Sequence, residues 1–236
     1  MPLPTRQYSI RRYEFDHWLM KRSGAEFRQH KVQSIRSENG YYIIDDTYRC
    51  KYLVGAGGTN CPVYRTLFRP QNPREEAKRI STMELEFPYQ YSDSSCYLWF
   101  FDHDLPGYSW YVPKGNNHLN IGIGGKFQDL RARGQTIRQH WEWFVEKLRR
   151  LRLVENIPTP VKGYNYYLRQ RLPMPHIGNA FLIGDAAGLA TIDMGEGIGP
   201  AIHSGLLAAR AILNGELYSP RKIPRYSLWD LLFWWR

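Results

Sequence analysis

The sequence predicts an α/β (α+β) fold in which a domain with a parallel sheet receives an inserted antiparallel β-sheet domain. Three observations support this prediction. An apolar run ends in a glycine and a carboxylate at 184–185, and a cluster of glycines at 195–199 precedes a helical pattern. Between 81 and 127, successive short segments have the aromatic, β-branched and alternating composition of antiparallel strands. The parallel-sheet domain is therefore expected on both sides of this insertion.

The elements are predicted in the following order along the chain. We expect a helix at Phe15–Ser23, a β pair at Lys31–Arg36 and Tyr41–Asp45, a strand at Tyr52–Val54, four strands at Met83–Tyr89, Tyr97–Phe101, Tyr108–Val112 and His118–Ile123, a helix at Gln135–Leu151 and a strand at Phe181–Ile183. The helix at 135–151 is amphipathic because one face gathers Ile137, Trp141, Phe144, Val145 and Leu148.

The stretch 181–211 reads as a buried strand, a glycine-rich turn and a helix. Its apolar strand stops at Gly184-Asp185, as expected at the carboxyl edge of a parallel sheet, where α/β folds bind ligands. Three glycines, Gly195, Gly197 and Gly199, would let the backbone approach such a ligand closely. The helix face that follows is marked at three-to-four spacing by Ile202, Leu206, Ala209 and Ile212.

The chemistry of this stretch favours a flavin as its ligand. The unpaired N–H groups at the start of a helix, here around Ile198, suit a group that gains negative charge, such as the N1/O2 edge of a reduced flavin. Asp185 could accept hydrogen bonds from sugar-like hydroxyls. The alternative is a tight strand-to-helix turn in which residues 186–190 only pack closely.

The longer pattern resembles a known flavin motif. GDAAG, then GEGI, then a helix with Ser204-Gly205 and Ala208-Ala209 is similar to the second flavin motif of the glutathione-reductase-type monooxygenase and geranylgeranyl reductase superfamily. The resemblance implies FAD as cofactor, with Asp185 on the ribityl chain. It implies a cofactor-binding set of Arg12, Gly184, Asp185, Gly195, Gly197, Ile198 and Gly199.

A second string resembles the geranylgeranyl reductases more narrowly. PGYSWYVPKG at 106–115, followed by LNIGIG at 119–124, is similar to their PxxYxWxxPKG…NxGxG segment. Those enzymes saturate isoprenoid double bonds with FAD, so Tyr108, Trp110 and Pro113 become candidate substrate-binding residues. From the residues alone, the same string is a hairpin with a packed Trp, which is the alternative.

Arg12 begins a segment that resembles the RxxFDxxL helix start of these flavoproteins. In that family the arginine reaches the phosphate and ribose region of the cofactor, a role that suits the fixed donors of a guanidinium group. A solvated Arg11-Arg12 pair ahead of an amphipathic helix is the alternative.

The run 52–65 resembles the VGADGxxSxVR turn of the superfamily, with two departures. Gly57 stands where an aspartate is expected, so that aspartate's role is not carried over and a monooxygenase-type coupling to NAD(P)H is disfavoured. Cys61 replaces a serine, and we expect a buried, inert thiol there.

The superfamily begins with a strand and a GxGxxG loop, which normally hold the pyrophosphate, and nothing similar precedes Arg12. The resemblance covers roughly residues 8 to 215 of 236. We therefore expect an N-terminally truncated member with a partial FAD-binding Rossmann-like domain. The predicted domains are the FAD-binding domain in two parts (1–80 and 163–217), the substrate-binding sheet and helix (81–162), and a basic, aromatic tail (218–236).

Composition limits the other classes of function. Lys and Arg number 32 against 22 Asp and Glu, a net charge of +10, but no nucleic-acid-binding motif accompanies it. The three cysteines and seven histidines show no metal spacing, so no metal is expected, and the setting is predicted to be cytoplasmic. The aromatic tail at 226–236 suits a peripheral membrane contact. Packing of the tail against protein is the alternative.

Together these patterns predict a flavin-dependent reductase. Reduced FAD would give a hydride to a prenyl-lipid double bond, and an external donor, NAD(P)H or ferredoxin, would reduce the flavin. No catalytic residue is assigned, and Tyr108, His176 and His203 are candidate proton donors. The alternatives are a flavoprotein monooxygenase or halogenase, and a fragment that binds no FAD and has at most an interaction role.

Overall fold

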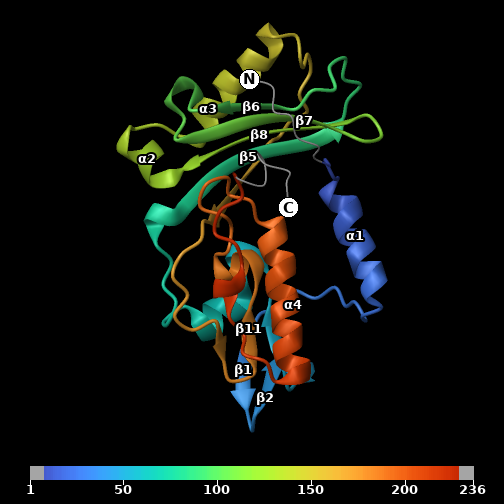
Figure 1. Ribbon diagram of the computed structural model, residues 1–236, viewed down its shortest axis with the longest axis vertical. Coiled ribbons are helices and arrows are strands. Elements are labelled where there is room, and N and C mark those ends of the chain that lie inside the picture. Colours follow the sequence, from blue (N-terminus) through green and yellow to red (C-terminus); the bar gives the residue numbers. More distant parts are fainter. Residues whose placement is uncertain (1–7, 229–236) are drawn as a thin grey trace. The chain divides into compact units, whose positions relative to one another are not determined.

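The computed structural model describes residues 8–228 of the chain (Figure 1). These residues form two compact units. The first comprises 29–78 and 166–228, and the second comprises 8–28 and 79–165. The helix predicted at 15–23 therefore falls in the unit that holds the antiparallel sheet, whereas the sequence placed it with the flavin domain.

Two small sheets form the frame of the first unit. One is an antiparallel meander of β1 (Ile35–Glu38), β2 (Tyr41–Ile44) and β3 (Tyr48–Cys50). The other has the order β10-β11-β4, from His176–Ile177, Ala180–Leu182 and Leu53–Gly55. β11 and β4 are parallel, with Phe181 opposite Val54. The predicted parallel edge ahead of Gly184 is thus confirmed, and the strand starts one residue earlier than expected.

The remaining elements of the first unit are short turns and one long helix. They are η1 (Gly58–Asn60), the π-helical turn η2 (Tyr64–Phe68), η3 (Glu76–Lys78), η5 (Gly184–Ala187), α4 (Ile198–Asn214) and η6 (Pro220–Lys222). The core lies between β4, β11 and these turns, where Phe68, Leu182 and Leu189 are almost fully buried. Apolar burial of this kind is the main stabilising term for such a small unit.

The second unit is built on a five-stranded sheet with the order β6-β7-β8-β5-β9. Its strands are β5 (Arg79–Pro88), β6 (Tyr97–Phe100), β7 (Gly107–Lys114), β8 (His118–Lys126) and β9 (Lys162–Tyr167). The four strands predicted between 83 and 123 are confirmed, and β5, β7 and β8 extend further than the sequence indicated. β7 and β8 form the expected hairpin, with Trp110 opposite Gly122.

The helices of the second unit are α1 (Arg12–Ser23), α2 (Phe127–Ala132) and α3 (Ile137–Arg150), with the short turn η4 (Asp102–Asp104). The amphipathic α3 starts at a capping box of Thr136 and Gln139 and packs against β8 and β5 (Figure 1). Its buried face, Trp141, Phe144 and Leu148, joins the core of the sheet. The predicted helix at 135–151 is therefore confirmed within two residues.

Within residues 8–228, no helix combines the length and the apolar character needed to cross a bilayer. Over the same residues, no three His, Cys, Asp or Glu side chains come together in a group that could hold a metal ion.

Candidate functional site

The turn after β11 requires glycine at position 184. Gly184 has a left-handed backbone (φ 54°), and its N–H donates a hydrogen bond of 2.9 Å to Oγ of the fully buried Ser204 in α4. A Cβ on Gly184 would lie 3.1 Å from the Cβ of Ala201. The turn and the first half of α4 therefore pack too closely for a larger residue.

The Asp185 carboxylate lies against the start of α4. A Cβ added to Gly197 would be only 3.2 Å from Oδ1 of Asp185, so the glycine leaves room for the acid. Gly197 is the residue from which α4 begins. The structure thus places Asp185 beside the helix terminus that contains three other predicted cofactor residues, Gly197, Ile198 and Gly199.

One N–H group at this terminus is already bonded, contrary to the expectation of free donors. Gly199 donates its N–H to Oε1 of Glu196 at 2.8 Å. The physical reason is that a carboxylate just ahead of a helix is stabilised by the N–H groups and by the positive end of the helix dipole. A ligand that used the Gly199 donor would have to displace Glu196, a residue to which the sequence analysis gave no role.

The loop 191–196 is held by a buried threonine. The Thr191 N–H donates to the Glu196 carbonyl at 2.9 Å, and the Glu196 N–H donates to Thr191 Oγ1 at 3.0 Å. Gly195 has a left-handed backbone (φ 65°), and a Cβ there would lie 2.2 Å from the Tyr166 hydroxyl. Gly195 is therefore needed both for its φ angle and for the space that Tyr166 fills.

Asp193 joins this loop to the segment 225–228. Its carboxylate accepts the N–H groups of Ser227 at 3.0 Å and of Leu228 at 2.7 Å, and Ile192 donates to the Arg225 carbonyl at 2.9 Å. Burial raises the pKa of Asp193, but the N–H donors from Leu228, Ser227 and Met194 outweigh it and hold that pKa below its ordinary value. The sequence analysis missed Asp193, because nothing local indicates a partner more than thirty residues away.

We expect Asp193→Asn to lower the thermal stability of the chain at pH 7, because an amide oxygen accepts the Ser227 and Leu228 donors less strongly than a carboxylate does. Since the folded-state pKa is lowered, the wild-type advantage is present above the unfolded-state pKa of about 3.9 and is lost as the pH falls through the folded-state pKa. Melting curves of both proteins from pH 7 to pH 3 measure this. A gap in melting temperature that stays constant over this range would contradict the assignment.

Arg74 joins the two turns that follow the parallel strands. Its guanidinium donates to the carbonyl of Thr59 in η1 and, at 3.4 Å, to that of Ala186 in η5. It also lies 4.0 Å from the ring centre of Tyr64 and 4.8 Å from that of Tyr167, on which its flat face can stack. No motif in the sequence pointed to this residue, and its role follows only from the pairing of β4 with β11.

The turn that departs from the superfamily pattern at Gly57 and Cys61 has a tightly packed backbone. A Cβ on Gly57 would lie 3.1 Å from Cα of Cys61, and Gly58 has φ 66°. Cys61 itself is 1% exposed and packs in the core of the first unit. The expectation of a buried thiol is therefore confirmed.

Two of the three candidate substrate residues share a face of the sheet. Tyr108 and Trp110 are two residues apart on β7, and their ring centres lie 5.6 Å apart. The pairing of β7 with β8 is continuous, so Pro113, an odd number of residues away, projects from the opposite face. The structure therefore groups Tyr108 with Trp110 and separates Pro113 from both.

Trp110 is held by polar residues of the neighbouring strands. Its Nε1 donates to Oδ1 of Asn120 at 2.6 Å, and Nδ2 of Asn120 donates to Oε1 of Glu84 at 2.6 Å. A Cβ on Gly122 would lie 2.1 Å from Cζ2 of the indole. In the NIGIG string, Asn120 thus orients the Trp110 ring and Gly122 leaves room for it.

The other predicted residues are placed as follows. Arg12 forms an ion pair of 3.0 Å with Asp16 one turn along α1, and both side chains are more than half exposed. His176 stacks on Phe181, with ring centres 5.6 Å apart, and His203 is exposed on α4. The role of Arg12 in cofactor binding stays a prediction, as do the three candidate proton donors.

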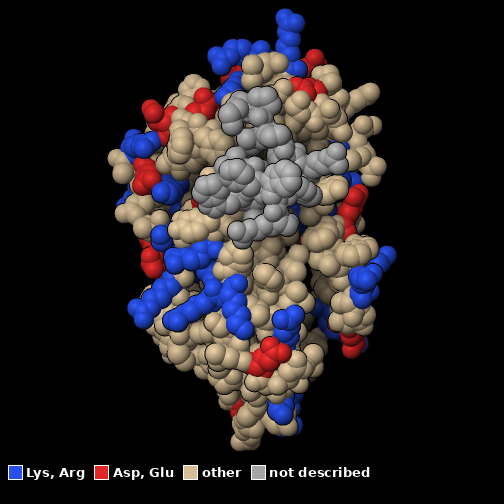
Figure 2. All heavy atoms as spheres, viewed as in Figure 1, with Lys and Arg blue, Asp and Glu red and all other residues tan. Residues whose placement is uncertain are grey.

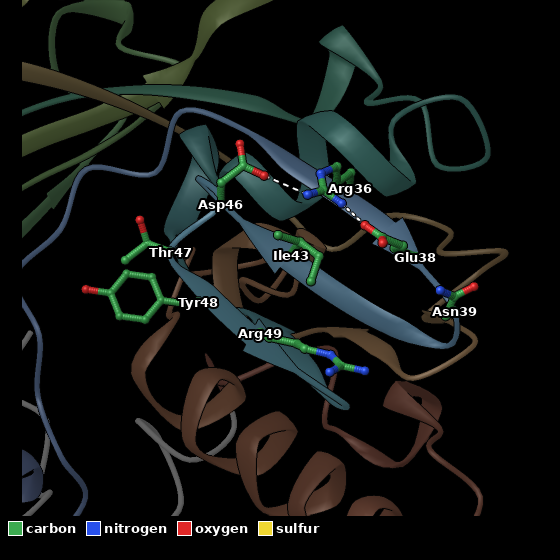
Figure 3. A pocket seen from close by; sticks show the side chains of 8 residues that line it. All are labelled: Arg36, Glu38, Asn39, Ile43, Asp46, Thr47, Tyr48 and Arg49. Carbon is green, nitrogen blue, oxygen red and sulfur yellow. Dashed lines mark hydrogen bonds and ion pairs between the residues drawn. The ribbon is translucent and has the colours of Figure 1, made fainter.

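A hollow on the β1–β3 meander is polar and carries its own counter-charges (Figure 3). Arg36 forms ion pairs there with Glu38 and, at 2.6 Å, with Asp46. None of the predicted site residues lines it. Because its charges are matched internally, we assign no ligand to it.

The donor set at 184–199 fits the ribityl and pyrimidine end of a flavin. Asp185 offers acceptor oxygens to hydroxyl groups, and the start of α4 beside it offers the Ile198 N–H and a positive dipole end, because Gly199 is bonded to Glu196 and Pro200 has no N–H.

Comparison with known proteins bears on this site. Residues 25–214 match the family model described as FAD binding domain. An uncharacterized protein of Methanosarcina barkeri is 32% identical over 215 residues, which cover 86% of this chain and 51% of that protein. A digeranylgeranylglycerophospholipid reductase of Thermoplasma acidophilum is 30% identical over 125 residues, covering 51% of this chain and 31% of the relative. The chain spans about half the length, or less, of these relatives.

Solved structures share the fold. A geranylgeranyl bacteriochlorophyll reductase-like protein from Thermoplasma acidophilum has a TM-score of 0.60 at 21% identity, over 80% of this chain and 50% of that one. CmlS, a flavin-dependent halogenase, also has a TM-score of 0.60, at 18% identity over 85% of this chain and 39% of that one. At these identities the likeness concerns the fold alone.

Proposed function

Because the chain belongs to the FAD-binding domain family, whose cofactor is FAD, we propose that it is the part of a flavin-dependent reductase that holds the isoalloxazine and ribityl end of FAD and presents an isoprenoid double bond to it. The observation that carries the proposal is the Asp185 carboxylate against Gly197 at the start of α4. Both the reductase activity and the isoprenoid substrate are proposed.

The chemistry that FAD supplies when bound and reduced is hydride transfer to a double bond. In this proposal, Asp185 orients the cofactor by accepting hydrogen bonds from its ribityl hydroxyls. The start of α4 would stabilise negative charge on the bound cofactor through its positive dipole end, and the Gly199 N–H would be available to the cofactor only if Glu196 gave it up.

The substrate class is supported by the sheet of the second unit. Tyr108 and Trp110 present an aromatic surface, which suits the apolar chain of a prenyl lipid. The relative from Thermoplasma acidophilum is named digeranylgeranylglycerophospholipid reductase, so its name refers to a prenyl lipid. A halogenase-type reaction is supported only by the shared fold. Gly57, in place of the expected aspartate, argues against the NAD(P)H coupling of the related monooxygenases.

Binding of flavin by the purified chain tests the first half of the proposal. We expect Asp185→Ala to weaken FAD binding at least about tenfold, because hydrogen bonds to a charged group contribute about 1.5–3 kcal/mol each. Quenching of flavin fluorescence measures the dissociation constant, and Asp129→Ala, on α2 in the second unit, is the matched control. Equal affinity of the Asp185 variant and the control would refute the assignment of Asp185.

Product analysis tests the second half. Dithionite-reduced chain loaded with FAD is incubated with a geranylgeranyl glycerophospholipid, and mass spectrometry looks for a gain of two hydrogens per saturated bond. Trp110→Ala should lower the yield without changing the FAD affinity. A flavin-loaded chain that leaves the lipid unchanged would refute reductase activity for this chain while leaving flavin binding intact.

A further inference from the structure

A buried arginine of the first unit has an unused donor. Arg169 is 7% exposed, and its Nη2 donates to the Pro220 carbonyl. Its Nη1 is buried and has no hydrogen-bond partner among the residues that the structure describes. An unpaired buried guanidinium nitrogen is costly, so native proteins normally satisfy it with an acceptor.

A second arginine increases the local positive charge. Arg225 lies near enough that its charge, together with the larger effect of burial, lowers the pKa of Arg169. Three exposed cations are close to them along the chain: Arg171 is two residues from Arg169, Arg221 directly follows Pro220, and Lys222 is three residues from Arg225. Over residues 8–228, no ion pair involves any of these five cations.

The surface of the first unit agrees with this description. The segment after α4 lies to the left of that helix in Figure 1, and in the same region Figure 2 shows Lys and Arg side chains gathered with few acidic ones among them. Like charges at this density repel one another unless an anion lies between them.

We propose that Arg169, Arg221 and Arg225 bind a phosphate group. Phosphate is an anion that arginine forks recognise well, because its oxygens accept paired N–H donors, and here it would also give Nη1 of Arg169 the acceptor that it lacks. The proposal does not depend on flavin chemistry.

The site has a direct connection to the loop 191–196. The Arg169 N–H donates to the Ala190 carbonyl at 2.6 Å, and the Arg225 carbonyl accepts from Ile192 at 2.9 Å. A phosphate that holds Arg169 and Arg225 together would therefore restrain the chain at Ala190 and Ile192, where the loop begins. Binding of phosphate should accordingly protect the amides of 191–196 from hydrogen exchange.

The test is a titration of the flavin-free chain with inorganic phosphate at constant ionic strength. We expect a saturable rise in melting temperature, since a ligand that binds only the folded state stabilises it. Arg225→Gln, an exposed change that should fold normally, is expected to raise the dissociation constant at least about tenfold. Arg138→Gln on α3 removes the same charge elsewhere and should change it less than about twofold.

Two sources of the phosphate are separated by parallel arms of the experiment. Glycerol 3-phosphate that competes with inorganic phosphate indicates a small phosphate ester. A lipid headgroup is indicated if vesicles of phosphatidylcholine and phosphatidic acid bind the wild-type chain but do not bind the Arg225→Gln variant. The proposal fails if neither probe shows saturable binding that depends on Arg225, or if Arg138→Gln weakens binding as much as Arg225→Gln does. Arg169→Gln, with hydrogen exchange as readout, checks that the buried donor is involved.

Discussion

Replacing Gly122 by alanine is expected to destabilise the chain by about 2–4 kcal/mol, which extends beyond the upper end of the usual range of about 1–3 kcal/mol for overpacking. The added Cβ would lie 2.1 Å from Cζ2 and 2.4 Å from Cε2 of Trp110, so the indole must leave its position. Moving it also breaks the hydrogen bond from Trp110 to Asn120, whose amide nitrogen donates to Glu84. The same change should therefore lower both stability and the reductase yield.

The measurement is urea unfolding together with the indole N–H resonance of Trp110. Gly115→Ala is the matched control, because it lies in the same hairpin and a Cβ there meets nothing within 4 Å. If Gly122→Ala unfolds at the same urea concentration as Gly115→Ala and leaves the Trp110 resonance in place, Gly122 does not position this ring.

Replacing Arg74 by leucine is expected to loosen both turns that follow the parallel strands. The variant loses two donors to main-chain carbonyls and the stacking on Tyr64 and Tyr167, which together should cost about 2–3 kcal/mol. Hydrogen exchange should become faster in 58–60 and 184–188, and FAD affinity should fall at least about tenfold.

Arg74→Lys and Arg69→Leu serve as comparisons. Lysine keeps the charge but cannot reach two carbonyls with a fixed fork, so we expect an intermediate effect. Arg69 is exposed in the same unit, and its loss should leave the exchange of 184–188 unchanged. Uniformly faster exchange throughout the first unit in Arg74→Leu would indicate global destabilisation and contradict a specific link between the turns.

Local patterns in the sequence predicted most of the elements correctly. The strand at 181–183, the hairpin around 113–117 and the helix at 135–151 were found because apolar periodicity and turn residues act over a few positions. The boundaries shifted by up to a few residues where pairing with a neighbour extends a strand, as in β8, whose three added residues include Gly124 and Gly125.

The candidate site was predicted only in part. Asp185 and Gly197 were singled out from a motif, and the structure brings them together. Arg74, Asp193 and Thr191 were missed, because each acts through main-chain groups that are distant in sequence or have no sequence signal at all. A backbone carbonyl or N–H looks the same at every position of a sequence.

The sequence by itself determined that this chain has a glycine-rich strand, turn and helix suited to a flavin, and an aromatic hairpin of the geranylgeranyl reductase type. Only the tertiary structure decided that Trp110 needs Gly122 and that Arg169 has an unused donor. The physical reason is that periodicity and turn chemistry are local, whereas space, burial and the pairing of charges exist only once distant segments are packed together.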